Sequence, residues 1–347
     1  MDRRIYPFTA IVGQELMKKA LLFNALDPSL EGVLIRGEKG TAKTTAVRGV
    51  AAILPPRPVV IGCPYGCHPE QEEGLCPECR ARQEKGEALR LAEVATPVVD
   101  LPLNASEDRV VGSIDIEAAI QQGRKVFLPG LLARAHRAIL YVDEGNLLDD
   151  HIVDVLLDVA VTGLNVVERE GVAYTHPARF ILVGTMNPEE GDLRPQLLDR
   201  FGLCAEVSAE GPAEGRAEII RRAIAFQRDP GAFAARWAPE EAALRARIVQ
   251  GRTMLKSLEP SALLVEFAAS VATEMEVDGH RAEITLIKAA LASASLNGRP
   301  APADEDLRDA LQLALRHRTK RMPLQTARPD PAVFDRLLSK YGSRGHL

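Results

Sequence analysis

A glycine-rich segment near the start of the chain has the residue types that bind phosphate. It reads Gly37-Glu38-Lys39-Gly40-Thr41-Ala42-Lys43-Thr44-Thr45, follows an apolar run and opens a helix-compatible stretch. In that context, backbone N–H groups and the helix N-terminus attract phosphate oxygens. We expect Lys43 to pair with the β- and γ-phosphates of a nucleotide and Thr44 to give its hydroxyl to Mg²⁺. The usual phosphate-binding pattern has glycine where Ala42 stands. The alternative to a phosphate-binding loop is a turn that merely connects a strand to a helix.

Two acidic residues follow a second apolar run, about 100 residues downstream. The run 139–142 leads directly into Asp143 and Glu144, which is the form of a Walker B motif. At the end of a strand, Asp143 can hold the hydration shell of Mg²⁺, and Glu144 can accept a proton from an attacking water. Two acids after a strand also occur as a solvated turn. Their presence together with the phosphate loop favours nucleotide hydrolysis.

Three more polar residues are candidates for the same site. Asn187 follows the apolar run 180–183 and could orient the hydrolytic water, although asparagine before proline is also a common turn. Arg200 precedes another apolar run and has the character of an arginine finger, with a surface salt bridge as the alternative. Because such a finger commonly comes from a neighbouring subunit, the presence of Arg200 predicts that the active form is a ring of subunits. Arg281, at the head of a later helical stretch, could reach the γ-phosphate.

Four of the five cysteines fall within a short segment rich in turn residues. Cys63 and Cys67 form one pair and Cys76 and Cys79 the other, with eight residues between the pairs. Four thiolates at this spacing predict a closed tetrahedral Zn²⁺ site that would order a segment too short to fold alone. An iron–sulfur cluster, free thiols or a redox disulfide are the alternatives. His68 is a possible substitute ligand.

The elements that must position these residues alternate along the first two thirds of the chain. Short apolar runs separated by helical spacing predict a parallel sheet flanked by helices, an α/β core. These runs cover residues 32–36, 97–101, 138–142, 180–183 and 203–207. Later segments carry only helical periodicity, at 213–227, 239–258, 261–277, 281–296 and 303–318. We therefore expect a core domain over 1–228, with a surface loop insertion at 55–86, and an all-helical lid domain over 229–347.

Composition excludes several classes of protein. The 347 residues include 43 basic and 48 acidic side chains, so a net charge of −5 argues against a nucleic-acid partner. The segment 121–125, a candidate pore segment, offers only two adjacent cations. There is no apolar run long enough to span a membrane and no secretion signal, which predicts a cytoplasmic protein. We expect the fifth cysteine, Cys204, to be buried and to pack in the protein interior.

Taken in order, these motifs resemble those of AAA+ ATPases, and the wider sequence resembles the I subunit of magnesium chelatase, in a variant with a four-cysteine insertion. The resemblance covers most of the chain. It is carried by four strings: Tyr6-Pro7-Phe8-Thr9-Ala10-Ile11-Val12-Gly13-Gln14, Leu140-Tyr141-Val142-Asp143-Glu144, Asn187-Pro188-Glu189-Glu190-Gly191 and Leu193-Arg194-Pro195-Gln196-Leu197-Leu198-Asp199-Arg200-Phe201-Gly202.

The resemblance implies roles and partners. Ile11 and Val12 would line the adenine pocket, Asn187 would be sensor 1, Arg200 the finger and Arg281 sensor 2. Apart from the resemblance, Arg194 is a similar but weaker candidate than Arg281 for contact with the γ-phosphate. ATP and Mg²⁺ would be the cofactors, and the subunits would form a homo-oligomeric ring, a hexamer. A D-type subunit with an integrin-like domain and an H-type porphyrin-binding subunit would be the partners.

The same resemblance implies two insertions facing the ring pore, at 108–132 and in a hairpin around 166–176; two plain surface hairpins are the alternative. We therefore expect an ATP-hydrolysing motor subunit that drives insertion of Mg²⁺ into protoporphyrin IX. A cobaltochelatase-type subunit and a MoxR-like remodelling ATPase remain alternatives. A DNA-acting motor and a nucleotide-binding protein without hydrolysis have less support from the sequence.

Overall fold

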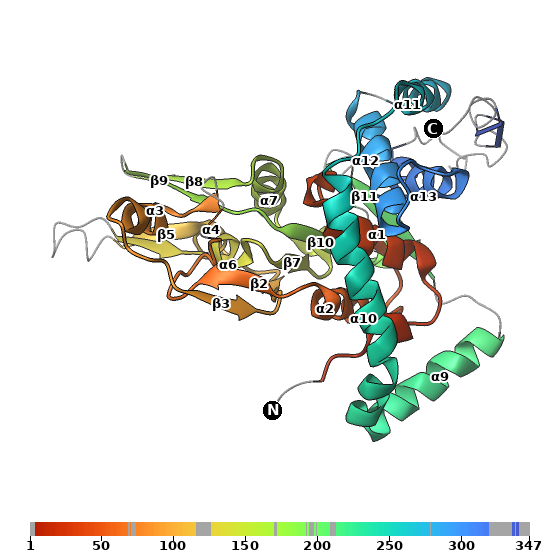
Figure 1. Ribbon diagram of the computed structural model, residues 1–347, viewed down its shortest axis with the longest axis horizontal. Helices are drawn as coiled ribbons and strands as arrows, with labels where there is room; N and C mark the ends of the chain where they lie inside the picture. The colour runs from red at the N-terminus through yellow and green to blue at the C-terminus, as the bar shows by residue number, and fades with distance from the viewer. Residues whose placement is uncertain are drawn as a thin grey trace. The chain divides into compact units, whose positions relative to one another are not determined.

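The computed structural model describes residues 4–68, 70, 74–115, 126–169, 172–191, 193, 198, 200–208, 213–277, 279–318, 335–336 and 338–339. Contacts divide the chain into two compact units (Figure 1). The first combines Met1–Ile53 with Met186–Leu347, and the second is Leu54–Thr185. The glycine-rich loop and the C-terminal helices therefore belong to one unit, although about 170 residues separate them in sequence.

Two parallel strands lead to the glycine-rich loop in the first unit. Strand β1 (Val33–Gly37) pairs with β11 (Leu203–Val207), and Gly37 lies opposite Val207. A Cβ atom added to Gly37 would lie 2.2 Å from the backbone oxygen of Val207, so no larger residue fits where β1 enters the loop. Helix α2 (Lys43–Ile53) begins directly after the loop.

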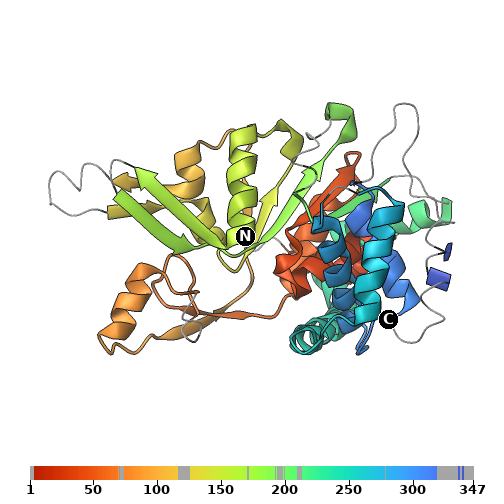
Figure 2. The same cartoon turned by 90° about the horizontal axis from the view of Figure 1, so that it is seen from above.

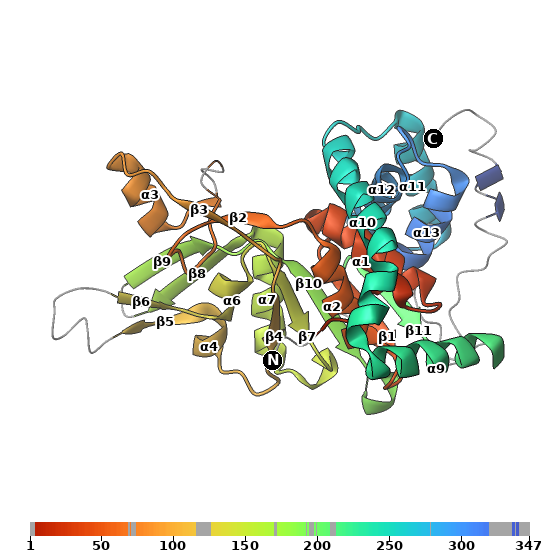
Figure 3. The same ribbon diagram turned by 60° about the horizontal axis from the view of Figure 1, so that its bottom comes forward.

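Further helices belong to the described part of the first unit (Figure 3). They are α1 (Glu15–Leu26), α9 (Ala213–Arg228), α10 (Pro230–Leu255), α11 (Ala262–Glu274), α12 (Arg281–Leu296) and α13 (Asp304–Leu315). Helix α12 packs against α1, α10, α11 and α13. Small side chains make this possible, because Ala289, Ala290, Ala292 and Ala294 are completely buried and allow neighbouring helices to approach closely.

Helix α10 begins earlier than the sequence pattern predicts. The helical periodicity predicts a helix that starts at Pro239, but the structure starts it at Pro230. The carboxylate of Asp229 accepts hydrogen bonds from the backbone N–H groups of Gly231 and Ala232, both at 2.9 Å, and caps the helix. Pro239 therefore lies inside the helix, where it removes one backbone donor.

The second unit contains three more parallel strands, in the order β4 (Val98–Leu101), β7 (Ile139–Val142) and β10 (Ile181–Met186). All residues of β7 and β10 are buried. Three helices accompany the strands: α4 (Glu107–Val111), α6 (Leu131–Ala135) and α7 (Asp150–Thr162). Short 3₁₀ turns elsewhere are η1 (Phe8–Ala10), η2 (Pro28–Leu30), η4 (Gly145–Leu147) and η5 (Pro188–Glu190).

Three antiparallel pairs of strands are also found among the described residues of the second unit (Figure 2). They pair β2 (Arg57–Val60) with β3 (Leu91–Val94), β5 (Gly112–Asp115) with β6 (Val126–Pro129), and β8 (Leu164–Arg169) with β9 (Val172–Pro177). Figures 1 and 3 both place β8–β9 beside β5–β6, and β5 contacts β8. The hairpin predicted around 166–176 is confirmed.

The cysteine segment is more ordered than the predicted surface loop. It contributes β2 and helix α3 (Pro77–Glu84), and three of its four cysteines are buried. Cys67, Cys76 and Cys79 pack with Val60, Tyr65, Leu75 and Ala133 in a small apolar cluster. The expectation of a plain loop was wrong, because the high content of charge and proline concealed this local core.

The predicted fold class is confirmed: five parallel strands with flanking helices, followed by an all-helical C-terminal region. The division into domains at residue 228 stays a prediction. Arg194 and the segment 121–125 lie outside the described residues. Within the described ranges, no helix has both the length and the apolar character needed to cross a membrane.

Acid should weaken the second unit through His136, whose ring is 1% exposed. Burial, with Arg137 and Arg57 nearby, lowers the pKa of His136 to about 3. Its pKa in an unfolded chain is about 6.5, so its contribution to stability is complete above that pH and is lost as the pH falls toward 3. Lowering the pH to about 5 should reduce the free energy of unfolding by about 2 kcal/mol through this residue.

Urea unfolding of the wild type and His136→Gln, at about pH 7.5 and about pH 5, measures this contribution. We expect the variant to lose less stability on acidification than the wild type. An equal loss in both proteins would contradict the role given to His136.

Candidate functional site

The glycine-rich loop is held closed by its own polar groups. The Lys43 ammonium donates hydrogen bonds to the backbone oxygens of Gly37 and Glu38, the latter at 2.9 Å. The Thr41 hydroxyl also donates to the Glu38 oxygen, at 2.8 Å. This places a cation at the N-terminus of α2, where the helix dipole also favours an anion. The arrangement suits binding of a polyphosphate.

Ala42 adopts the backbone conformation that explains the usual glycine at this position. Its φ is +63°, in the left-handed region that residues with a Cβ atom rarely occupy. Alanine is small enough to accept this conformation at a cost of about 1 kcal/mol. The departure from the usual motif therefore adds strain to the loop.

A β-branched residue should not be accepted at this position. We expect Ala42→Val to lower ATP hydrolysis about tenfold or more, because the left-handed conformation is much less accessible to valine. Ala42→Gly should keep at least wild-type activity. Steady-state hydrolysis and nucleotide affinity of both variants provide the measurement, and wild-type activity in Ala42→Val would show that the conformation is not required.

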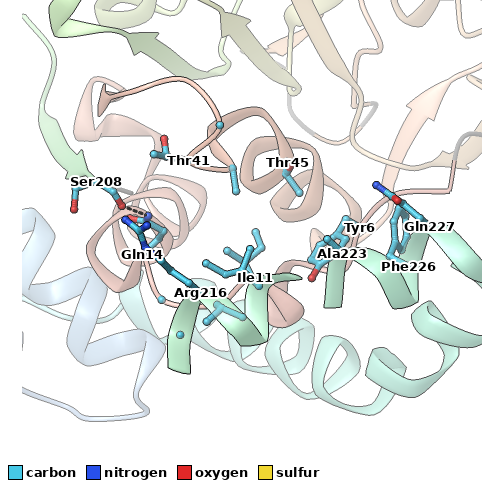
Figure 4. Close-up of a pocket in the computed structure, with 16 residues that line it drawn as sticks. Tyr6, Ile11, Gln14, Thr41, Thr45, Ser208, Arg216, Ala223, Phe226 and Gln227 are labelled. Atoms are coloured by element: carbon cyan, nitrogen blue, oxygen red, sulfur yellow. Dashed lines mark hydrogen bonds between the residues drawn. The ribbon is translucent and has the colours of Figure 1, made fainter. Parts of the chain in front are cut away.

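A cavity of about 600 Å³ lies beside the loop in the first unit. Its walls come from the N-terminal segment, from the loop with the start of α2, and from α9 (Figure 4). Ile11 and Val12, predicted to contact adenine, are both in the wall, together with Gly40, Ala42 and Thr45. The size and apolar walls are typical of a site for an organic ligand.

The sequence interpretation missed the aromatic wall of this cavity. Tyr6 and Phe226 both line it, with their ring centroids 5.0 Å apart in an edge-on arrangement. Gln14 also lines it, and its amide donates to the backbone oxygen of Ser208 at 2.9 Å. Tyr6 and Gln14 are part of the first string of the family resemblance. Phe226 has no local signal, since it is one apolar position of an amphipathic helix.

The two Walker acids are arranged by residues of their own unit. Oδ1 of Asp143 accepts hydrogen bonds from the hydroxyls of Tyr141, at 2.8 Å, and Thr185, at 2.7 Å. The Glu144 backbone N–H donates to the same Thr185 hydroxyl at 3.2 Å. Glu144 has a φ of +52°, and such strain is often found at functional sites. Thr185, fully buried and not predicted from the sequence, therefore positions both acids.

The three remaining candidates lie in the first unit. Asn187 is 4% exposed, and its side-chain oxygen accepts a hydrogen bond from the Glu189 backbone N–H at 3.3 Å. The Arg281 guanidinium forms an ion pair with Glu31 at 3.3 Å. Arg200 is half-buried. Their proposed roles as sensors and finger stay predictions.

The four predicted cysteines converge in the second unit. Their sulfur atoms all lie within 4.8 Å of one another, and the Sγ atoms of Cys63 and Cys76 are 3.8 Å apart. Four sulfurs bound to one Zn²⁺ at about 2.3 Å in a tetrahedron would lie about 3.8 Å apart. His68 is not in the group; its Nδ1 accepts a hydrogen bond from the Glu70 backbone N–H at 3.1 Å.

Backbone groups support these sulfurs. The Cys76 N–H donates to Cys67 Sγ at 3.2 Å, and the Cys79 N–H donates to Cys76 Sγ at 3.4 Å. Hydrogen bonds from Cys67 and Cys76 lower the pKa of Cys63, whereas burial raises the pKa of Cys79. A divalent cation among the sulfurs would displace the remaining protons. The donor set and spacing fit one soft, tetrahedral metal ion.

These features define the class of the protein. A phosphate loop after β1, an acid pair after β7 and parallel strands flanked by helices are those of a P-loop ATPase, and residues 265–337 match the AAA lid domain. The protein is an AAA+ ATPase.

Comparison with known proteins shows the family. Residues 111–207 match the family "Magnesium chelatase, subunit ChlI". The magnesium-chelatase 38 kDa subunit of Acidiphilium rubrum is 52% identical over 92% of this chain and 92% of its own length. A magnesium-chelatase subunit ChlI homolog of Methanocaldococcus jannaschii is 49% identical over 97% of this chain and 92% of its own length. The chain belongs to the family of magnesium chelatase I subunits.

A solved structure agrees with this relationship. A chain from the complex between subunits BchI and BchD of magnesium chelatase, reconstructed by cryo-electron microscopy, is 48% identical. The match covers 92% of this chain and 98% of that chain, with a TM-score of 0.55.

Proposed function

We propose that this chain is the ATP-hydrolysing subunit of a tetrapyrrole metal chelatase that inserts Mg²⁺ into protoporphyrin IX. The observation that carries the proposal is the 52% identity to a magnesium-chelatase subunit over almost the full length of both proteins. The phosphate loop and the acid pair supply the residues that hydrolysis requires. Cobalt insertion and remodelling of other metalloproteins have less support, because the relatives reported above carry magnesium-chelatase names.

Each site residue then has a chemical role. Lys43 binds the β- and γ-phosphates and Thr44 gives its hydroxyl to Mg²⁺. Asp143, held by the hydroxyls of Tyr141 and Thr185, accepts hydrogen bonds from the hydration shell of that ion. Glu144 accepts the proton of the attacking water, which makes the water a stronger nucleophile.

The other site residues act around this chemistry. Asn187 orients the water. Arg200 stabilises negative charge on the transferring phosphoryl group of a neighbouring subunit, and Arg281 contacts the γ-phosphate. Ile11 and Val12 contact the adenine within a cavity large enough for a nucleoside.

Insertion itself requires partners. We propose that ATP hydrolysis by this chain is coupled to a D-type and an H-type subunit. The BchI–BchD complex among the similar structures supports the D-type partner. We propose a hexameric ring as the active form, since Arg200 would serve the site of its neighbour.

Partner binding provides the first test. The purified chain should hydrolyse ATP, form a ring with ATP and Mg²⁺, and bind a magnesium-chelatase D subunit in light-scattering chromatography. Hydrolysis without binding to the D subunit would favour the remodelling function. A lack of hydrolysis in an assembled ring would contradict the proposal.

We also propose that Cys63, Cys67, Cys76 and Cys79 bind one Zn²⁺. The four cysteine sulfurs of an iron–sulfur cluster are distributed over two or four iron atoms, so the close grouping of all four sulfurs here favours a single ion. Zn²⁺ bound here would neutralise thiolate charge and fix the two cysteine pairs against each other. Elemental analysis should find about one zinc per chain, whereas visible absorption from iron and sulfide would contradict this assignment.

A further inference from the structure

The two cysteine pairs each present one side chain to the same tyrosine of a distant hairpin. Tyr65 lies between Cys63 and Cys67, and its hydroxyl is 3.0 Å from that of Tyr174. Glu78 lies between Cys76 and Cys79, and it accepts a hydrogen bond from the Tyr174 hydroxyl at 2.6 Å. Tyr174 has both partners only when the two cysteine pairs are held together.

Tyr174 also contacts hairpin β5–β6. It belongs to β9, and its ring stacks on Phe127 of β6, with centroids 4.2 Å apart and planes 11° from parallel. One side chain thus touches the cysteine segment through its hydroxyl and hairpin β5–β6 through its ring. The cysteine segment, hairpin β5–β6 and hairpin β8–β9 are far apart in sequence, and they meet at Tyr174.

A second set of contacts supports the same connection. The Tyr65 ring packs against His176 of β9, with centroids 4.8 Å apart. Nε2 of His176 is 2.9 Å from the amide nitrogen of Asn165 in β8, and that amide donates to the Val111 backbone oxygen at 2.7 Å. His176 and Asn165 are each 1% exposed, so this path runs through the interior of the unit.

Stability of the cysteine segment depends on what holds its four sulfurs. Outside the small cluster around the cysteines, the segment is polar: helix α3 buries only Cys79, and the cysteines form no disulfide. Separating the pairs would remove Tyr65, Glu78 or both from the Tyr174 hydroxyl. A hydrogen bond to a charged carboxylate is among the stronger ones, so the hairpin would lose a substantial restraint.

We propose that the metal-bound cysteine segment positions hairpins β8–β9 and β5–β6, with Tyr174 as the positioning residue that transmits metal occupancy to them. The inference rests on the proposed metal site. Its consequence is that hairpin order depends on the metal, even though neither hairpin supplies a ligand.

Amide hydrogen exchange of the full chain without nucleotide tests the proposal, using the zinc-loaded and chelator-treated forms of the wild type, Tyr174→Phe and Thr175→Val. Thr175→Val is the control, because it removes an exposed hydroxyl from the adjacent position of β9. In the wild type, zinc removal should speed exchange in β5, β6, β8 and β9 about tenfold or more. Tyr174→Phe should bind zinc normally, exchange as fast with zinc as the stripped wild type, and respond little to zinc removal.

The outcomes separate the inference from the metal site itself. If zinc binds and its removal speeds hairpin exchange equally in the wild type and Tyr174→Phe, Tyr174 is not the connection and the proposal is overturned. If zinc binds to the wild type and its removal leaves exchange in the hairpins unchanged, the positioning role is overturned and the proposed metal site is kept. If no metal binds, the proposed metal site is overturned and the inference with it. Thr175→Val should behave as the wild type throughout.

Discussion

Replacing Glu144 with glutamine should lower ATP hydrolysis by about a hundredfold or more and leave ATP bound. The expected size follows from loss of general-base catalysis, which contributes about 10²–10⁴-fold. The amide is close to isosteric with the carboxylate and does not accept the water proton at neutral pH. Affinity for ATP should change little, because in the proposed site the loop around Lys43 binds the phosphates and the cavity beside it binds the adenine.

Single-turnover hydrolysis and equilibrium binding of a fluorescent ATP analogue separate the two effects. Glu93→Gln is the matched control, since Glu93 is an exposed acid on β3 of the same unit, remote in sequence from both motifs. Wild-type turnover in Glu144→Gln would show that another group is the base. A loss of ATP binding would instead indicate that Glu144 is needed for the shape of the site.

Replacing Cys76 with serine should remove the metal. Cys76 is fully buried, lies 3.8 Å from Cys63 and accepts a hydrogen bond from the Cys79 backbone N–H. A serine hydroxyl is a poor ligand for Zn²⁺, so zinc affinity should fall by about a hundredfold or more. Zinc content should then decrease from about one per chain toward none, and the cysteine segment should become sensitive to proteolysis.

Cys204→Ser is the control for this experiment. Cys204 is also buried, but it lies in β11 of the other unit and is not among the grouped sulfurs. The Cys204→Ser variant should keep its zinc. Full zinc content in Cys76→Ser would contradict a four-sulfur site, and equal loss in both variants would point to a general loss of folding.

The sequence predicts the elements whose signals are local and strong. All five parallel strands are found where apolar runs indicate them, because buried strands of this kind leave little room for polar residues. The phosphate loop and the four cysteines also have fixed spacing, so their grouping can be predicted. Helix α10 shows the limit: the cap at Asp229 is a single residue, and the helical periodicity located only the part of the helix that follows Pro239.

Residues that act through tertiary contacts could not be found in this way. Thr185 positions Asp143 and Glu144 from another strand, and its sequence neighbours give no sign of it. Tyr174 meets Tyr65 and Glu78 only after the hairpin folds against the cysteine segment. The side chains in these contacts are about 40 residues apart for Thr185 and about 100 residues apart for Tyr174, and single-sequence patterns carry no information at either separation.

The central claim is that ATP hydrolysis by this chain drives insertion of a metal ion into a tetrapyrrole. The most direct measurement is the absorbance and fluorescence of protoporphyrin IX, followed with ATP, Mg²⁺, this chain and the D and H subunits of a magnesium chelatase. We predict formation of magnesium protoporphyrin that requires the chain and stops when Glu144→Gln replaces it. Steady ATP hydrolysis without formation of the magnesium porphyrin would contradict the claim.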